Sequence, residues 1–316
     1  MRVLLRIIAV PLLSILCTAQ SAKDLLSKGK VDEAIQDVDA RISANKNDAE
    51  SLNLLCRAYY IVEDWDHAVD NCERAVEADP NKSAYHQWLG RASGEKADHS
   101  SFITAARLAK KVRTEFEQAV QLDGTNLGAR LDLAEFYLEA PGMMGGGEDK
   151  ARTQATLIGK TNPAKEHWVY ARIAEKNKDY ATAEKEYRSA IDLSKGASDT
   201  WLDLAVFYRK RERYDDMESA LHKATTGTVS PPEVLMDGAD TLLRANGNLS
   251  FAIELLKRYL AGPTVEEGPA FKAHYLLGTA FEKQGNTQGA AEEYRQSLAL
   301  AHNYARAKEA LKRVTG

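Results

Sequence analysis

Apolar and small residues recur along this chain at the spacing of one face of an α-helix. Residues 49–82 show the pattern most clearly. One stripe at positions i, i+3, i+4 and i+7 is formed by Leu52, Leu55, Cys56 and Tyr59. A second stripe is formed by Ala68, Cys72 and Ala75. The polar residues between the stripes offer Asp64 as a helix cap, and Pro80 ends the second helix because a residue before proline disfavours helical geometry. The stretch therefore predicts two antiparallel helices joined by a tight turn.

The same two-helix pattern repeats along the chain. The small residue of the second helix recurs at separations of 34, 44, 39, 32, 34, 35 and 38 residues, at Ala34, Ala68, Val112, Ala151, Ala183, Met217, Ala252 and Ala290. The small residue of the first helix recurs at Cys56, Gly90, Ala134, Ala171, Ala205, Ala239 or Asp240, and Gly278. Four positions after each of these small residues of the second helix stands a residue that is usually bulky: Val38, Cys72, Phe116, Ala155, Tyr187, Leu221, Leu256 and Tyr294. We expect the small residues to let the helices of a hairpin approach closely, and the bulky ones to fill the space between neighbouring hairpins. Because one hairpin cannot bury its apolar face alone, neighbours must stack.

The order Leu-x2-Leu-small-x2-Tyr, followed by Ala-x3-bulky-x2-Ala-x4-Pro, resembles the tetratricopeptide repeat. Residues 49–82 and 271–304 carry most of its landmarks, and the resemblance extends over roughly residues 23–304. It implies an all-α, right-handed superhelical solenoid of about seven helix–turn–helix repeats, forming one domain over residues 20–316. The repeats are expected near residues 20–48, 49–82, 83–126, 127–163, 164–197, 198–232, 233–270 and 271–304. Residues 305–316 are amphipathic and are expected to cap an open end of the solenoid.

Two of these repeats are longer than the others. The third carries about ten extra residues near positions 94–105, and the fourth carries about five near positions 141–147. Insertions between paired helices of a solenoid usually form loops on one edge, and long loops are often functional. We therefore expect two extended loops.

The first residues have the layout of a secretory signal peptide. Arg2 and Arg6 precede an apolar stretch, residues 7–16. Small residues follow this stretch, starting at Cys17. The apolar run is short, because a membrane-spanning helix needs about 20 such residues. We expect residues 1–19 to be a cleaved signal peptide and the mature protein to act in the periplasm or to be secreted. Two alternatives remain: lipoprotein processing at Cys17, and retention of the segment as a membrane anchor.

The other two cysteines lie on the two helices of one predicted hairpin. Cys56 and Cys72 are sixteen residues apart, and an exported protein meets an oxidising compartment. They can form a disulfide if their Cα atoms come within about 7 Å of each other. The alternative, which the sequence alone favours, is that both are small buried core residues without a bond between them.

The motifs that carry chemistry are weak in this sequence. The net charge is −4 with no concentrated basic block, which argues against nucleic-acid binding. The glycine-rich residues 142–147 run into Glu148 and Asp149, whose carboxylates would repel a phosphate at the start of a helix. The basic residues within 106–113 fit either a solvated helix face or a patch for an acidic partner. None of the seven histidines has metal-ligand spacing, and no hydrolase motif occurs. We therefore expect no enzymatic activity, no cofactor and no metal.

The resemblance to the tetratricopeptide family points to a binding groove instead. In that family the first helices line a concave face along which peptide partners lie. Carried over position by position, this geometry places in the groove Asn53, Arg57, Tyr60, Gln87, Arg91, Glu135, Trp168 and Arg172. Of the family's carboxylate-binding positions the chain offers Asn53 alone, which argues against capture of a chain-terminal carboxylate.

The expected function is a non-catalytic scaffold that binds a protein or peptide in the cell envelope. The alternatives are a membrane-anchored assembly factor, associated with the membrane through its N-terminal segment, and a helper subunit or enzyme that acts on an envelope polymer.

Overall fold

The computed structural model describes residues 21–316. The expected signal peptide, including Cys17, lies outside these residues. Within them all regular structure is helical. The first half contains α1 (Ala22–Ser27), α2 (Val31–Ala44), α3 (Ala49–Ile61), α4 (Trp65–Ala78), α5 (Ser83–Asp98), α6 (Phe102–Leu122), α7 (Leu127–Glu139), the short 3-10 helix η1 (Gly142–Met144) and α8 (Glu148–Gly159). The second half contains α9 (Pro163–Lys176), α10 (Tyr180–Leu193), α11 (Ser198–Lys210), α12 (Tyr214–Thr225), α13 (Val234–Arg244), α14 (Leu249–Leu260), α15 (Ala270–Lys283), α16 (Thr287–Leu300) and α17 (Ala305–Thr315).

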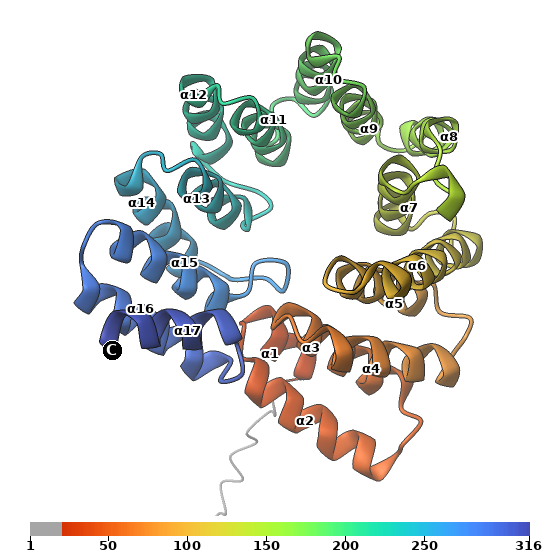
Figure 1. The fold of residues 1–316 in the computed structure, drawn as a ribbon, viewed down its shortest axis with the longest axis horizontal. Coiled ribbons are helices and arrows are strands. Elements are labelled where there is room, and N and C mark those ends of the chain that lie inside the picture. The colour runs from red at the N-terminus through yellow and green to blue at the C-terminus, as the bar shows by residue number, and fades with distance from the viewer. Residues whose placement is uncertain (1–20) are drawn as a thin grey trace, which may run out of the picture.

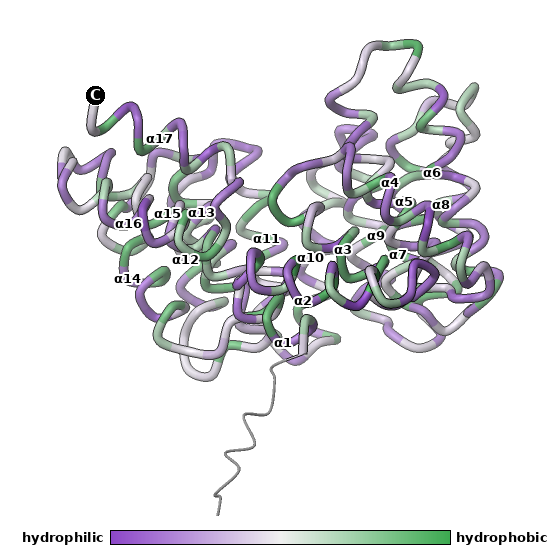
Figure 2. The backbone as a smooth tube through the Cα atoms, turned by 90° about the horizontal axis from the view of Figure 1, so that it is seen from below, coloured by the Kyte–Doolittle hydropathy of each residue, from purple (hydrophilic) through white to green (hydrophobic). Residues whose placement is uncertain are grey.

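Consecutive helices pair into eight antiparallel hairpins that stack side by side, and α17 follows the last pair (Figure 1). The sequence therefore predicted the fold class correctly: the molecule is a helical-hairpin solenoid. In the side view, apolar and polar positions alternate along the labelled helices, as expected for helices that each bury one face (Figure 2).

The small residues of the first helices bring the two helices of a hairpin together. A Cβ atom on Gly90 would lie 2.4 Å from the ring of Phe116, and one on Gly278 would lie 2.6 Å from the ring of Tyr294. Phe116 and Tyr294 are buried bulky residues of the second helices in the same hairpins. The bulky residue therefore packs against the glycine of its own hairpin as well as filling the space beside it.

The turn within most hairpins places one residue in the left-handed region. Its φ is +67° at Gly29 and +80° at Gly285, and the turns between them use Glu63, Lys178, Glu212 and Asn246 at φ of 67°, 60°, 57° and 49°. In several hairpins an aspartate or asparagine next caps the second helix; the Asp64 carboxylate, for example, accepts a hydrogen bond from the backbone N–H of His67. The turn itself therefore tolerates side chains other than glycine.

The long third hairpin differs from the sequence-based expectation. The extra residues do not form a loop: they lengthen the helices, so that α5 has 16 residues and α6 has 21. The segment from Ala105 to Lys111 is rich in Ala, Leu and Lys, which favour helix and explain the extension. At the resulting tip, Phe102 and Ile103 are 81% and 83% exposed. The shorter insertion, residues 141–147, forms a loop that includes η1, as expected.

The two ends of the solenoid meet, so the chain closes into a ring (Figure 1). Phe271 at the start of α15 is fully buried in one apolar cluster with residues of α1–α3, including Leu26 and Ile61. Tyr304 belongs to the same cluster. This corrects the expectation of an open end: α17 covers α16, but the turn before it also contacts the first hairpins. We call the contact of residues 21–63 with residues 261–306 the seam.

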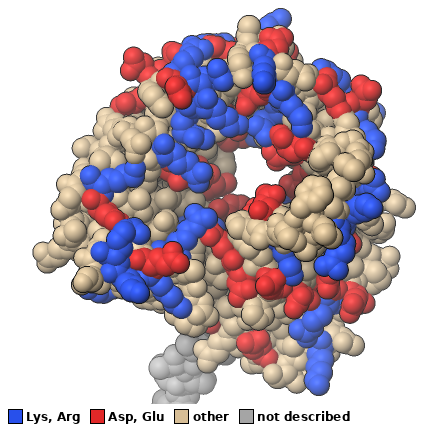
Figure 3. Space-filling model, in the orientation of Figure 1, with Lys and Arg blue, Asp and Glu red and all other residues tan. Residues whose placement is uncertain are grey.

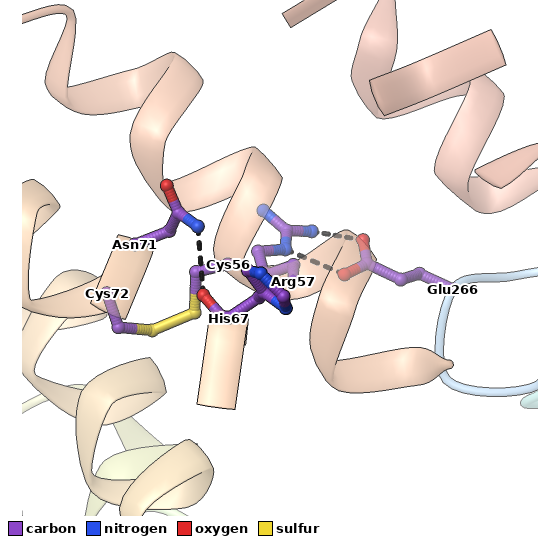
Figure 4. Close-up of a disulfide and its surroundings, with 6 residues drawn as sticks. All are labelled: Cys56, Arg57, His67, Asn71, Cys72 and Glu266. Carbon is purple, nitrogen blue, oxygen red and sulfur yellow. Dashed lines mark hydrogen bonds and ion pairs between the residues drawn. A yellow bond between two sulfur atoms is a disulfide. The ribbon is translucent and has the colours of Figure 1, made fainter. Parts of the chain in front are cut away.

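Cys56 and Cys72 form a disulfide bond between α3 and α4, with their Cα atoms 5.1 Å apart (Figure 4). Both residues are fully buried. The alternative of two unbonded core cysteines therefore does not describe this structure. The bond ties together the two helices of the hairpin that carries Arg57.

A separate finding concerns membranes. Within residues 21–316, none of the helices combines the length and the apolar character that crossing a bilayer requires.

Candidate functional site: the inner wall of the ring

The first helices of the hairpins face the centre of the ring, where an opening remains with several acidic side chains at its border (Figure 3). Three connected hollows follow this inner wall. The first lies over α5 and α7, the second over α9, α11 and α13, and the third over α13, α15 and the turn before α17. Glu135 lines both the first and the second, and Asp237, Asp240 and Arg244 line both the second and the third. We call the residues of these hollows the inner wall.

The first hollow is organised by Asp132 on α7. Its carboxylate accepts hydrogen bonds from Gln87 Nε2 at 2.7 Å and from Arg91 Nε at 2.7 Å. The Arg91 guanidinium also lies 5.1 Å from the ring of Trp88, which holds it by a cation–π contact. Because its charge is paired and its plane is stacked, Arg91 presents a fixed, partly exposed surface to the hollow.

The second hollow combines an aromatic residue with both signs of charge. Arg172 bridges Glu135 and Glu139 of the preceding hairpin, at 3.0 and 3.3 Å, and lies 6.0 Å from the ring of Trp168. Arg244 is paired with Asp240 at 2.6 Å and its side chain is 61% exposed. Arginine and tryptophan are the residue types enriched where proteins bind one another.

Two partly buried carboxylates in this part of the wall have raised pKa values. Burial raises the pKa of Asp203 to about 6, with Lys165 opposing the rise. Burial, and next to it the repulsion of Glu233 and Asp240, raises the pKa of Asp237 to about 7. The negative charge of these carboxylates is only partly compensated by their neighbours. A cation brought to this wall would therefore lower their pKa values and be bound favourably.

The structure places the eight predicted groove residues unevenly. Tyr60, Arg91, Glu135, Trp168 and Arg172 line the first two hollows. Asn53 and Gln87 are only 4% and 8% exposed, and the Gln87 side chain is hydrogen-bonded to Asn126 and Asp132 of the next hairpin. Arg57 is held by Glu266 across the seam. For Asn53, Gln87 and Arg57 the expectation of a free groove side chain is therefore corrected.

Several inner-wall residues were missed by the sequence analysis. Asp132, Asp203 and Asp237 all stand two positions before the small residue of their first helix, and Arg209 stands four positions after it, as Tyr60 does. Asp240 stands directly after Ala239, the position that Arg57, Arg91, Glu135 and Arg172 occupy in their repeats. The predicted groove positions, carried through the sixth and seventh hairpins, find Arg209 and Asp240, whereas Asp132, Asp203 and Asp237 stand at a position that the sequence analysis does not assign to the groove.

The polar groups of this wall do not converge on one point. Among residues 21–316 no group of three or more histidine, cysteine or acidic side chains is arranged to hold a metal ion. The polar groups are instead distributed along an extended surface, which suits contact with a macromolecule.

Comparisons with known proteins concern the fold. Residues 241–305 match the tetratricopeptide repeat family. Yeast Tom70 shares the fold with a TM-score of 0.55 at 14% identity; the match covers 94% of this chain, which spans 64% of the Tom70 chain. A tetratricopeptide repeat protein from Parabacteroides merdae matches with a TM-score of 0.43 at 15% identity, covering 85% of this chain and 99% of that one. No curated protein matches the sequence.

Residues 241–305 thus match a tetratricopeptide repeat model, and the eight hairpins stacked within residues 21–316 form a helical-hairpin solenoid.

Proposed function

We propose that this protein is a non-catalytic scaffold that binds a protein or peptide partner along the inner wall of its ring. The observation that carries the proposal is the continuity of three hollows lined by Trp168, by arginines and by carboxylates. The tetratricopeptide fold supports it, because solenoids of this kind create extended concave binding surfaces. The partner is expected to carry both cationic and acidic groups, since both signs of charge line the wall.

We further propose that the protein acts in the cell envelope. The support is the sequence of residues 1–19, with its two arginines and short apolar run. Mass spectrometry of the protein isolated from its host tests this. A mature chain that starts at Gln20 agrees with export and cleavage, whereas an intact Met1 favours the membrane-anchored assembly factor instead.

Partner binding is tested by cross-linking and affinity capture from the native host. The informative variant carries Lys210→Glu and Arg244→Glu, because both residues line the second hollow. The matched control carries Lys110→Glu and Lys185→Glu, which make the same charge change on exposed positions of the second helices α6 and α10. We expect the wild type and the control to capture the same amount of partner. The inner-wall variant should capture at least about tenfold less, since one or two anchors often dominate an interface. Equal capture by all three proteins would move the binding surface away from the inner wall.

A further inference from the structure

The seam joins parts of the chain more than 200 residues apart through a small set of named contacts. Arg57 donates to Glu266 from Nε at 2.7 Å and from a second guanidinium nitrogen (Figure 4). Elsewhere along the seam, Asp32 accepts from the backbone N–H of His302 at 2.9 Å, and Thr264 donates to the Ser27 carbonyl at 3.0 Å.

Gly29 shows that the two ends fit each other closely. A Cβ atom at this position would lie 2.6 Å from the backbone nitrogen of Ala270. The equivalent turn residue Gly285 has no atom within 4 Å of such a Cβ, and Asn246 occupies the same turn position in the seventh hairpin. The turn therefore accepts a side chain, but the approach of Ala270 at the seam does not.

The seam differs in kind from the contacts between consecutive hairpins. In residues 21–316, no helix of the first hairpins packs along the length of α15, α16 or α17. The ends instead meet through the 261–269 loop and the first residues of α15 and α17. The apolar part centres on Phe271 and Tyr304, and most of the rest is polar. Ion pairs that reach solvent, such as Glu63 with Arg306, contribute little to stability, because water and salt screen their attraction.

Opening the seam would leave every hairpin intact. The contacts within hairpins and between neighbours do not depend on the seam, since each repeat of a solenoid is supported by its neighbours. Separation would cost the Arg57–Glu266 and Glu63–Arg306 pairs, the burial of Phe271 and Tyr304 against the first hairpins, and a few hydrogen bonds. It would also return the conformational freedom that the closed loop of chain has lost.

From these observations we propose that the seam is a gate: the two ends of the solenoid separate and rejoin as a unit, without unfolding of the hairpins. The gate gives a partner sideways access to the inner wall and then encloses it. This second role rests on the proposed function, whereas the opening itself does not.

Hydrogen exchange and small-angle X-ray scattering on the full chain test the opening without a partner. The variant Arg57→Glu places two carboxylates together in the seam, and the exchange of the His302 amide is the readout. Arg57 is bound to Glu266 rather than to His302 or Asp32. Faster exchange at His302 would therefore report a concerted separation. We expect at least a tenfold increase in that exchange rate, a larger radius of gyration and unchanged helical content.

Two controls keep the test specific. The double variant Arg57→Glu with Glu266→Arg reverses the pair and should restore slow exchange at His302 and the smaller radius. Gly29→Asn should open the ring because of Ala270, whereas Gly285→Asn places the same residue in the equivalent turn, away from the seam, and should leave it closed. The gate is rejected if Arg57→Glu and Gly29→Asn leave the radius of gyration and the His302 exchange rate at wild-type values. It is also rejected if the wild-type His302 amide exchanges only as slowly as the interior amides of α9.

Because these readouts need no partner, loss of the gate and loss of inner-wall binding are separate results. If the ring opens and the Lys210→Glu, Arg244→Glu variant captures as much partner as the wild type, the gate is retained and the inner wall is rejected as the binding surface.

Discussion

Asp237 illustrates how a single residue sets a pH dependence. Its pKa is about 7 in the folded protein, because of burial and the nearby carboxylates of Glu233 and Asp240, against an ordinary value of 3.8. Between these two pH values the folded state holds a proton that the unfolded state has released. The contribution of Asp237 to stability therefore falls as the pH rises from about 4 to about 7.

The variant Asp237→Asn removes this penalty. At about pH 8 we expect it to unfold with a free energy higher than that of the wild type by roughly 1–2 kcal/mol, and at about pH 4.5 to show no gain. Urea unfolding at the two pH values measures the difference. The exposed Asp192→Asn serves as the control and should change stability at neither pH. A gain that is equal at both pH values would contradict the explanation by charge.

At the residue scale, the sequence predicted which positions face the centre of the ring better than it predicted which side chains are free. Arg91, Trp168 and Arg172 line the hollows as expected. Periodicity gives the direction in which a side chain points, but not its partners. For that reason it could not show that Glu266, from a loop 209 residues away, holds Arg57.

At the element scale, the spacing of two helices depends on one glycine in the third hairpin. Gly90→Ala places a methyl group against the ring of Phe116, whereas Gly94→Ala on the same helix meets only Val112, at 3.9 Å. We expect Gly90→Ala to destabilise the protein by about 1–3 kcal/mol through overpacking. Gly94→Ala should stabilise it by about 0.5–1 kcal/mol, because alanine favours helix more than glycine does. Denaturant titrations compare the two variants, and similar effects from both would exclude close packing as the cause.

The second hairpin carries a different constraint, the disulfide between α3 and α4. A cross-link that closes a loop of this length stabilises a protein by about 3 kcal/mol, mainly by restricting the unfolded chain. We therefore expect a reducing agent to lower the melting temperature of the wild type. The Cys56→Ala, Cys72→Ala double variant should melt at that lower temperature with or without reductant. If the wild type melts at the same temperature in both conditions, the bond does not contribute to its stability.

The helices themselves could be read from the sequence because each carries its own periodic stripe and its own turn. The third hairpin is the exception. There the length of the insertion predicts a loop, whereas the stretch from Ala105 to Lys111 consists largely of good helix formers and is helical. Composition therefore predicts this hairpin better than insertion length does, and it is the lengthened helices that carry Phe102 and Ile103 at their tip.

At the scale of the whole molecule, ring closure had no signal in the repeat pattern. The curvature of a solenoid is the sum of small rotations from one repeat to the next. These rotations depend on side-chain volumes and helix lengths in every hairpin. A pattern of small and bulky positions therefore predicts that the solenoid curves, but not how far the summed rotation turns it.

A solenoid whose ends touch has lost the freedom to grow. Open arrays can gain or lose units by duplication and deletion, because each unit needs only a neighbour. In this molecule a ninth hairpin would carry Glu266 and Phe271 beyond the reach of Arg57 and Leu26, and a missing one would stop short of them. Within residues 21–316, closure of the ring therefore depends on there being eight hairpins.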